Sequence, residues 1–470
     1  MKKNRIPLAI SISYNELSFF NKYKQLSYDK TQHVLLESRR GGRYSIAAID
    51  PIGEINAKNG CTTIKINGQV TEEIGNPFLI VEKWMKQWKS KVNLELPDFQ
   101  GGAIGFISYD SIHYFEDIPS EATDDLNVPD LYFLIFNDVA VYDHEKKLLW
   151  LITHYTNEME KLEGERRLEE WKNSWLLQEE INPVYNYEQK ACEEEPIVFE
   201  KESFEKAVQK VKSYISAGDV FQVNLSVRHA KPVETHPFNI YMALRDINPS
   251  PYMAYIHTPD FQIVSGSPEL LIKKKEKKLS TRPIAGTRSR GKNAKEDIKL
   301  AYELINNKKE RAEHVMLVDL ERNDLGRVCE YGTVEVDEFM VIEKYSHVMH
   351  IVSNVTGILK NDKGFSDIFE GVFPGGTITG APKIRTMEII EELEPTKRGI
   401  YTGSIGWIGF NEDLEFNIVI RTLFVKNGYG YVQAGAGIVI DSKAENEYKE
   451  SLKKSAAVWQ AKETSEKYNR

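Results

Sequence analysis

Short apolar runs separated by turn residues dominate the first third of the chain and predict many strands. The strand-like segments are residues 34–38, 41–47, 101–109, 132–142 and 148–154. The last two of these segments predict a buried hairpin. Helical spacing of apolar residues appears at 79–88 and at 160–175. Residues 1–176 therefore read as a lobe that mixes strands and helices.

An acidic and irregular stretch follows at residues 177–200 and contains Pro183 and three consecutive glutamates at 193–195. It lacks the periodicity of a helix or a strand, and we interpret it as a linker. A second domain is then expected over residues 201–465. The total of 470 residues is too long for one compact core, which agrees with two lobes.

The second domain opens with a predicted helix and then a strand of strict alternation at 219–227. In this strand Gln222, Asn224 and Ser226 share one face, and apolar residues share the other. Two amides and a hydroxyl on one face can line a polar pocket. The alternative is a strand edge that faces solvent.

The segment 374–383 passes from a glycine-rich loop into a helix. Gly375, Gly376 and Gly380 permit tight turns and let backbone N–H groups approach a ligand. The apolar residues after Lys383 keep helical spacing. A glycine-rich loop at a helix N-terminus is a ready anion site, whereas the plainer interpretation is a capped loop without a ligand.

Two further predicted strands carry polar residues in apolar surroundings. Arg421 lies inside the apolar segment 416–425 and needs a partner if it is buried. The segment 346–353 holds His347 and His350, which strand parity places on opposite faces. A core histidine with a satisfied hydrogen bond is the plainer interpretation of either one.

Acidic residues offer candidates for a proton donor and a cation site. Glu269 is a lone acid after a predicted strand, and Glu313 lies on a predicted helix. Glu447 and Glu450 are three residues apart on the last predicted helix and share a face. Paired carboxylates suit a hard cation such as Mg²⁺, and the alternative is solvated surface charge.

Charge and cysteine content limit the classes of partner. The formal net charge of −9 argues against nucleic acid or an anionic membrane as the main partner. The three cysteines are widely spaced, which is typical of a reducing cytoplasm. The N-terminus does not read as a signal peptide, and no run approaches the length of a membrane span. We therefore expect a cytoplasmic protein.

In combination, the motifs of the second domain resemble the chorismate-utilising enzymes along its whole length. They occur in the order of that family: GDVFQVNLS (218–226), GSPEL (266–270), RPIAGTRSRG (282–291), AEHVMLVDLERNDLGR (312–327), HVMHIVS (347–353), PGGTITGAPK (374–383), FNIVIRTL (416–423) and AGAGIV (434–439). LLES (35–38) and GGAIGF (101–106) resemble the N-terminal part of the ammonia-using members. The resemblance implies an α+β fold, a two-lobed sandwich of antiparallel sheets with helices outside and an active site between the sheets.

The resemblance also implies roles for single residues. Glu269 matches the acid that protonates the leaving hydroxyl of chorismate, and His350 matches the active-site histidine. Glu313 and Glu450 match ligands of Mg²⁺, with Glu447 in the same carboxylate cluster. The positions that match the substrate contacts and the substrate loop are Gly286, Thr287, Thr379, Lys383, Tyr401, Arg421, Gly435 and Gly437. The positions that match a tryptophan effector pocket are Ser38, Pro251, Tyr252 and Met253.

Gln222 separates the branches of this family. Members that add water to chorismate carry a lysine there as a catalytic base, whereas an uncharged glutamine resembles the members that use ammonia. Those members are the anthranilate synthases and the aminodeoxychorismate synthases, each the large component of a pair. None of the cysteines has the sequence context of a glutaminase nucleophile. The ammonia is therefore expected from a separate glutamine amidotransferase subunit, in a heterodimer.

The choice between the two ammonia-using branches depends on a few positions. Asn224 and Ala254 resemble the aminodeoxychorismate branch, which serves 4-aminobenzoate and folate synthesis. Ala285 is typical of anthranilate synthases, because many members of the other branch have a lysine there that is proposed to bond to the substrate. We expect the aminodeoxychorismate branch. The alternatives are anthranilate synthesis and a regulator that binds chorismate or tryptophan without catalysis.

Overall fold

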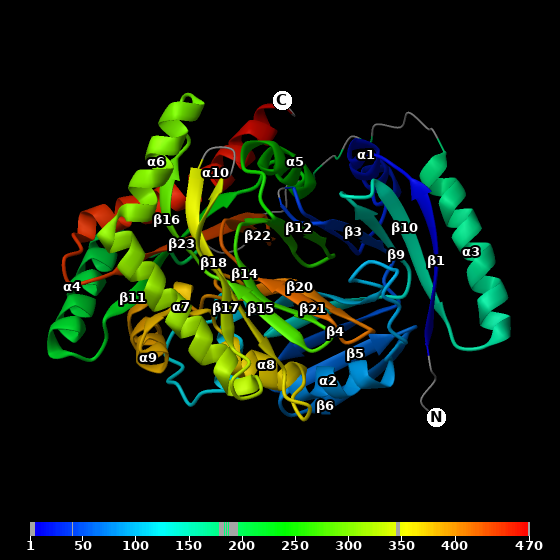
Figure 1. Cartoon of the computed structure of the whole chain (residues 1–470), viewed down its shortest axis with the longest axis horizontal. Helices are drawn as coiled ribbons and strands as arrows, with labels where there is room; N and C mark the ends of the chain where they lie inside the picture. Colours follow the sequence, from blue (N-terminus) through cyan, green and yellow to red (C-terminus); the bar gives the residue numbers. More distant parts are fainter. Residues whose placement is uncertain are drawn as a thin grey trace.

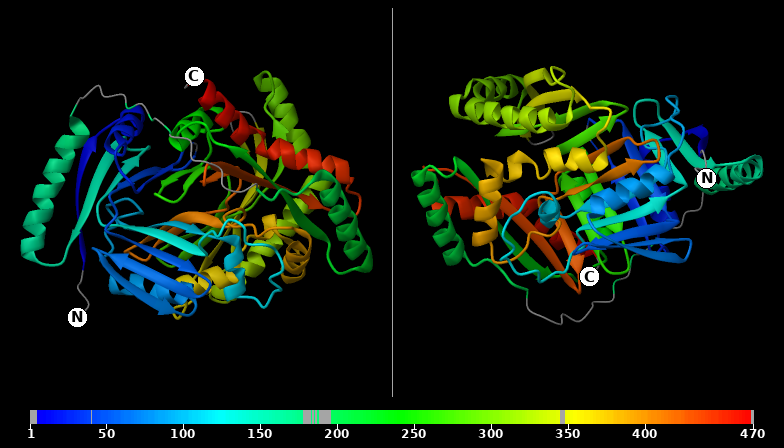
Figure 2. Two further views of the ribbon diagram at one scale, coloured as in Figure 1. Left: turned by 180° about the vertical axis from the view of Figure 1, so that it is seen from behind. Right: turned by 90° about the horizontal axis from the view of Figure 1, so that it is seen from below.

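Two large antiparallel β-sheets form the centre of the molecule, and helices cover their outer surfaces (Figures 1 and 2). The computed structural model describes residues 5–39, 41–177, 183, 185, 187, 196–344 and 348–468. Most of the predicted linker, together with His347 and Cys192, lies outside these described residues. The arrangement confirms the predicted α+β sandwich.

The first sheet has 11 strands and combines early and late parts of the chain. Its order is β1 (Ile6–Ser13), β10 (Leu148–Tyr155), β9 (Val139–Asp143), β3 (Tyr44–Ile49), β2 (His33–Glu37), β12 (Tyr252–His257), β13 (Gln262–Ser267), β22 (Thr422–Lys426), β23 (Tyr429–Ile438), β11 (Gln222–Pro232) and β19 (Gly380–Ala381). Strands β2 and β12 pair antiparallel, which makes the sheet continuous across the two predicted lobes.

The second sheet has 12 strands and is built in the same way. Its order is β16 (Ile284–Ser289), β18 (Val348–Ile358), β15 (Lys278–Arg282), β14 (Leu270–Lys275), β21 (Leu414–Asn417), β20 (Ser404–Gly409), β7 (Gly102–Ile107), β8 (Leu131–Phe136), β4 (Gly53–Lys58), β5 (Cys61–Ile66) and β6 (Gln69–Ile74), with β17 (Glu335–Lys344) paired to β18. The pairing of β7 with β20 joins the early and late strands. Each predicted lobe thus contributes strands to both sheets, and the domain boundaries at 177–200 stay a prediction.

The helices pack against the outer faces of both sheets (Figure 1). They are α1 (Glu16–Leu26), α2 (Pro77–Gln87), α3 (Glu158–Leu176), α4 (Lys201–Ala217), α5 (Pro237–Ile247), α6 (Ala294–Asn306), α7 (Lys308–Val328), α8 (Phe365–Val372), α9 (Lys383–Leu393) and α10 (Ala444–Tyr468), with short 3₁₀ turns η1 (Tyr109–Tyr114) and η2 (Gly376–Ile378). Helices α5 and α10 cover the 11-stranded sheet, and α7 covers β16 and β18 of the other sheet. Among the described residues, no helix is both long and apolar enough to cross a membrane.

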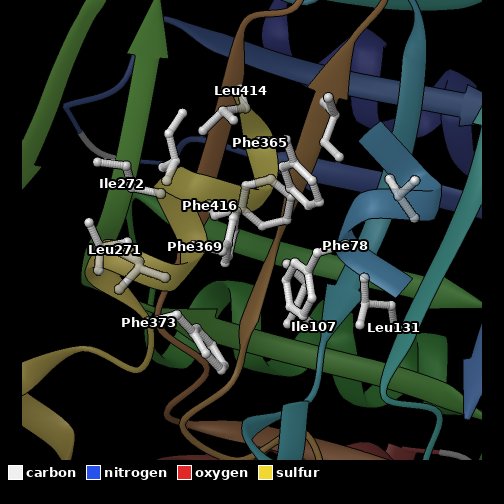
Figure 3. Close-up of a cluster of buried hydrophobic side chains, with 14 of the residues drawn as sticks. Phe78, Ile107, Leu131, Leu271, Ile272, Phe365, Phe369, Phe373, Leu414 and Phe416 are labelled. Carbon is white, nitrogen blue, oxygen red and sulfur yellow. The ribbon is translucent and has the colours of Figure 1, made fainter. Parts of the chain in front are cut away.

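A layer of apolar side chains joins the 12-stranded sheet to helices α2 and α8 (Figure 3). Phe416 of β21 packs edge to face on Phe369 of α8, with ring centroids 5.1 Å apart. Phe78 of α2 packs on Phe369 from the other side, at 5.8 Å. All three side chains are fully buried, and burial of one such ring contributes about 1.5–3 kcal/mol. This layer fixes α8, which leads directly into the glycine-rich loop.

One predicted strand proves to be two. The apolar segment 132–142 contains most of β8 in the 12-stranded sheet and most of β9 in the 11-stranded sheet. Asn137 and Asp138 separate the two strands, and the chain crosses between the sheets there. Both strands are buried along their whole length, so their hydrophobicity does not show that they belong to different sheets. The segment 148–154 lies in β10 and pairs with β9 as a hairpin, as predicted.

Candidate active site

The polar face of β11 points away from the helices that cover this part of the sheet. Val223 and Leu225 pack in the same apolar cluster as α4 and α9, so Gln222, Asn224 and Ser226 occupy the opposite face of the strand. Asn224 and Ser226 are buried, and β19 covers the edge of β11 beside Gln222. The structure therefore favours a polar pocket over a strand edge that faces solvent.

Glycines of β23 leave room for these side chains. A Cβ on Gly437 would lie 2.5 Å from Nε2 of Gln222. A Cβ on Gly435 would lie 2.3 Å from Oδ1 of Asn224 and 2.8 Å from the hydroxyl oxygen of Tyr401. Burial raises the pKa of this hydroxyl, and the nearby backbone of Gly435 offsets part of the increase. The absence of a side chain at Gly435 and Gly437 thus lets Gln222, Asn224 and Tyr401 gather over the strand.

The glycine-rich loop closes the open edge of β11 and leads into α9, as predicted. The N–H of Asn224 donates to the carbonyl oxygen of Thr379 at 2.8 Å. The Thr379 hydroxyl donates to the carbonyl oxygen of Gly375 at 3.1 Å. Nζ of Lys383, at the start of α9, lies 2.5 Å from Oδ2 of Asp324. Thr379 and Lys383, predicted in the substrate loop, thus already bind other parts of the protein.

A buried ion pair ties β11 to the end of this loop. Arg398 and Glu394 are each 4 % exposed, and Nη2 of Arg398 lies 2.7 Å from Oε1 of Glu394. Arg398 also donates to the carbonyl oxygens of Asn224 at 2.7 Å and of Ile378 at 3.1 Å. Glu394 accepts bonds from the backbone N–H and the hydroxyl of Ser226. Sequence reasoning missed this pair, because its four-residue spacing is common and α9 ends before Glu394.

Arg421 lies in the loop that joins β21 to β22 instead of inside a strand. The prediction of one strand over 416–425 is wrong, because β21 and β22 belong to different sheets and a loop joins them. Arg421 has a φ of +53°, a left-handed conformation that residues with a Cβ rarely adopt. Its positive charge lowers the pKa of Glu269 and of His350, so the guanidinium lies near both groups. Such strain concentrates at functional sites.

Glu269 is a buried acid at the start of β14. Burial raises the pKa of its carboxyl to about 7. The nearby Thr377 hydroxyl and the charges of Arg421 and Lys454 offset part of this increase. A carboxyl group with a pKa near neutrality is present in both protonation states at pH 7, which suits a proton donor.

A bulge in β16 places Thr287 beside His350. The pairing of β16 with β18 shifts register between Ala285 and Thr287, and Gly286 between them has a φ of +62°. Nδ1 of His350 lies 3.0 Å from the carbonyl oxygen of Gly286 and 3.1 Å from the Thr287 hydroxyl. Because a carbonyl oxygen accepts, Nδ1 carries the proton in this bond. Burial lowers the pKa of His350, which keeps the ring neutral at pH 7.

Acidic side chains of α7 and α10 affect one another electrostatically. Glu313 is half-buried, and its pKa is raised by burial and by the charges of Glu310 and Glu450. Glu447 is half-buried one turn before Glu450. The part of the chain that the structure describes contains no group of three or more histidine, cysteine, aspartate or glutamate residues placed to bind a metal. Of the three predicted metal residues, Glu313 and Glu450 thus influence each other electrostatically across the two helices, and a magnesium site stays a prediction.

Lys454 is a candidate that sequence reasoning missed. Its Nζ donates to the carbonyl oxygen of Gly435 at 2.9 Å and lies 2.9 Å from Oε1 of Glu450. Its charge also lowers the pKa of Glu269 and of Glu313. Lys454 thus connects the glycines of β23, the buried acid and the paired carboxylates. The four-residue spacing from Glu450 on α10 was the available signal, but exposed helix surfaces show the same spacing.

A separate cavity of about 630 Å³ lies between the two sheets. Ser38, Pro251, Tyr252 and Met253, predicted as an effector pocket, line it together. Charged side chains line another part of its wall, where Nζ of Lys273 lies 2.6 Å from Oε2 of Glu415. The structure thus brings these four positions into one cavity, apart from Gln222, Tyr401 and their neighbours.

Comparison with known proteins places this geometry in a family. Residues 31–460 match the family model described as chorismate binding enzyme. Aminodeoxychorismate synthase component 1 of Bacillus subtilis (strain 168) is 56% identical over 464 residues, which cover 98% of this chain and 98% of that protein.

Two anthranilate synthases are more distant relatives. Anthranilate synthase component 1 of Acetivibrio thermocellus is 41% identical over 97% of this chain and 95% of that protein. The crystal structure of anthranilate synthase component I from Streptococcus pneumoniae TIGR4 superposes with a TM-score of 0.77, at 37% identity, and covers 89% of this chain and 92% of that one. The chain therefore belongs to the family of chorismate binding enzymes.

Proposed function

We propose that this chain aminates chorismate at ring carbon C4, as the large component of an aminodeoxychorismate synthase. The observation that carries the proposal is the 56% identity to such a component over 98% of the chain. The geometry supports a reaction that loses a hydroxyl group, because a buried acid with a pKa of about 7 lies beside an arginine. The product, 4-amino-4-deoxychorismate, serves 4-aminobenzoate and folate synthesis.

Chorismate is a dianion, and cationic and N–H groups of the candidate site suit its carboxylates. Arg421 presents a guanidinium near Glu269, and Lys454 presents an ammonium beside Gly435. Guanidinium groups bind carboxylates through paired, charge-assisted hydrogen bonds. Tyr401 and the bulge at Gly286 and Thr287 complete the contacts that we assign to substrate. These assignments suit an anion held between the two sheets.

The amination exchanges one bond to the ring for another. The nitrogen of ammonia bonds to carbon as the carbon–oxygen bond of the hydroxyl breaks, and the electron pair of that bond leaves with oxygen. Glu269 protonates the leaving oxygen, which departs as water, and the nitrogen releases one proton. Hydroxide is a poor leaving group, so a proton donor is required.

Gln222 and Ala285 bear on which nucleophile attacks the ring and on whether the protein bonds to the substrate. The amide of Gln222 lies against Gly437 and carries no charge, so it does not act as the base that water would need. Ala285 is buried in β16 and provides no amine that could bond to the ring. We therefore assign direct attack by ammonia on the substrate.

The paired carboxylates fit a magnesium ion. The charge of Glu450 raises the pKa of Glu313, which is a repulsion that a divalent cation relieves. Mg²⁺ binds through a few carboxylates and completes its shell with water and substrate oxygens. We propose that Glu313 and Glu450 hold the ion, with Glu447 beside them. When bound, it would neutralise a carboxylate of chorismate and stabilise negative charge in the ring.

Ammonia is proposed to come from a glutamine amidotransferase subunit. The similar proteins are named as component 1 of their synthases, which supports a second component. The three cysteines of this chain show no glutaminase motif in the sequence.

The product identifies the reaction. We expect the purified chain with chorismate, Mg²⁺ and ammonium chloride at pH 8.5 to yield a product that retains the enolpyruvyl group, detected by chromatography and mass spectrometry. An added lyase should convert it to 4-aminobenzoate. Direct release of anthranilate and pyruvate without the lyase would assign the chain to the other branch, and binding without turnover would make it a regulator.

Replacement of the proposed proton donor has two measurable effects. Glu269→Gln should lower kcat by about 100-fold or more, the usual contribution of a general acid. The raised pKa also means that the neutral Glu269 stabilises the fold at low pH, and that this stability is lost as pH rises through about 7. Between pH 5 and pH 9 the wild type should therefore lose about 3 kcal/mol of unfolding free energy that the variant keeps.

Urea denaturation at both pH values measures this difference. Glu335→Gln removes an exposed glutamate from β17 and is the matched control, with unchanged pH dependence expected. If the stability of the wild type and of Glu269→Gln depends on pH in the same way, the raised pKa of the buried Glu269 carboxyl is contradicted.

The metal assignment is tested with Glu313→Gln. Loss of one carboxylate ligand should raise the Mg²⁺ concentration for half-maximal rate by at least tenfold, about the cost of disturbing a metal site. Titration calorimetry of Mg²⁺ should show the same loss of affinity. Asp319→Asn on the exposed face of α7 is the control and should change neither value. Unchanged Mg²⁺ affinity in Glu313→Gln would refute the assignment.

We also propose that the cavity lined by Ser38 and Tyr252 accepts tryptophan. Its volume of about 630 Å³ suits a small ligand, and its wall offers apolar and charged groups to the ring and to the amino and carboxyl groups. Titration calorimetry with L-tryptophan should show one site, and Tyr252→Ala should weaken it at least tenfold. No heat of binding with the wild type contradicts this proposal and leaves the amination unaffected.

A further inference from the structure

A second, small cavity lies behind Tyr401. Its volume is about 20 Å³, which is room for one molecule the size of water. Arg228, Arg398, Tyr401, Val419 and Gln433 are among the residues that line it. The cavity thus adjoins a side chain of the candidate active site and is too small for a molecule of chorismate.

The polar groups around this cavity are incompletely paired. Gln433 is 7 % exposed, and its Nε2 donates to the Ser226 hydroxyl at 2.8 Å. Its Oε1 has no hydrogen-bond partner among the described residues. Arg228 is 4 % exposed, and its Nε and Nη1 likewise lack partners within the described chain. Buried donors and acceptors normally have partners, because leaving one unpaired costs about 1–3 kcal/mol.

An occupant of this cavity must both accept and donate hydrogen bonds. Arg228 needs an acceptor, and Gln433 needs a donor. Two molecules of suitable size do both: water and neutral ammonia. The ammonium ion has no lone pair to accept a bond from Arg228. The nearby carboxylate of Glu394 does not attract it, since Arg398 and Ser226 already bind that group.

The cavity lies along a line of polar groups that leads to the substrate site. Ser226 and Asn224 follow Arg228 on the same face of β11. Oδ1 of Asn224 lies beside Gly435 and the Tyr401 hydroxyl, and it also lacks a partner among the residues described. Gln433 lines the cavity together with Tyr401, and Asn224 lies near the Tyr401 hydroxyl, so two acceptors that lack partners among the described residues lie close to this tyrosine.

On its outer side the cavity ends near the protein surface. Arg228 forms an ion pair with Asp125 and donates to the carbonyl oxygen of Ile197 at 3.2 Å. The Asp125 side chain is 16 % exposed and Ile197 is 40 % exposed. The cavity therefore lies between the surface and the substrate site, with Arg228 at its outer end.

We propose that this cavity holds one molecule of neutral ammonia before it attacks the substrate, with Gln433 and Arg228 as positioning residues that bind ammonia and exclude ammonium. The inference rests on the proposed amination. Ammonia would donate a hydrogen bond to Oε1 of Gln433 and accept one from Arg228, which pairs that acceptor and one of the two unpartnered Arg228 donors and leaves ammonia uncharged. The same contacts would deliver it past Tyr401 toward Oδ1 of Asn224.

The test uses the full-length chain with chorismate, Mg²⁺ and ammonium chloride, at several pH values between 7 and 9. In Gln433→Met the acceptor is lost and the volume of the side chain is nearly kept. We expect the KM for neutral ammonia to rise about tenfold, and the KM for chorismate to stay within about twofold of wild type. When KM is calculated from the concentration of neutral ammonia, its fold-increase in the variant should be the same at every pH, because ammonium does not bind.

A second variant covers the case in which Gln433→Met does not fold, as judged by circular dichroism and thermal unfolding. Val419→Ile adds one methylene group to the wall of the cavity and should raise the KM for ammonia similarly while keeping or raising the melting temperature. The matched control is Gln100→Met. Gln100 is 2 % exposed and also has an unpartnered Oε1 among the described residues, but it does not line the cavity.

The outcomes separate the two proposals. If the wild type forms no aminated product, the proposed amination and the ammonia site fail together. If the wild type is active and both variants keep the wild-type KM for ammonia, the ammonia site alone is refuted and the cavity holds water. An equal rise in both KM values also refutes it, because the cavity would then only support Tyr401.

Discussion

The buried ion pair between Arg398 and Glu394 holds together the parts from which the candidate site is made. Its guanidinium binds backbone carbonyls of β11 and of the glycine-rich loop, and its carboxylate binds both donors of Ser226. Removing two charges from water costs several kcal/mol per ion, and good geometry with complete hydrogen bonding is needed to offset that cost. The backbone around the pair therefore has little freedom to move. Tyr401 and the polar face of β11 stay in register as a consequence.

Around this pair, irregular backbone and glycines, which have no side chain, give the site its shape. Gly435 and Gly437 make room for polar groups that any larger residue would displace. The bulge at Gly286 brings Thr287 to His350, and Arg421 takes up a left-handed conformation between the two sheets. Each of these features interrupts regular pairing, so the surrounding sheets must supply the rigidity. A rigid set of dipoles and charges is what stabilises a developing charge most effectively.

Charge is distributed very unevenly in this acidic protein. Arg421 and Lys454 gather beside the buried Glu269, while Glu313 and Glu450 stand near each other. The net charge of −9 is a sum over the surface, and it is informative about large polyanionic partners only. A small dianion responds to the local field between the sheets, where burial weakens screening. For this reason the composition argued against nucleic acid as the main partner and remained compatible with an anionic substrate.

The sequence by itself determined the local patterns: the alternation that puts Gln222 with Asn224, the change from loop to helix at Lys383, and the motifs that identify the family. It did not reveal that the segment 132–142 crosses between sheets, or that Arg421 lies between two strands, because a short polar interruption in an apolar segment does not show with which strand the next residues pair. The Arg398–Glu394 pair had no local signal either. Its key partner, Asn224, is 174 positions from Arg398. Periodicity reports the environment of a residue over a few neighbours, whereas these contacts exist only after distant strands pair, so the tertiary structure alone decided them.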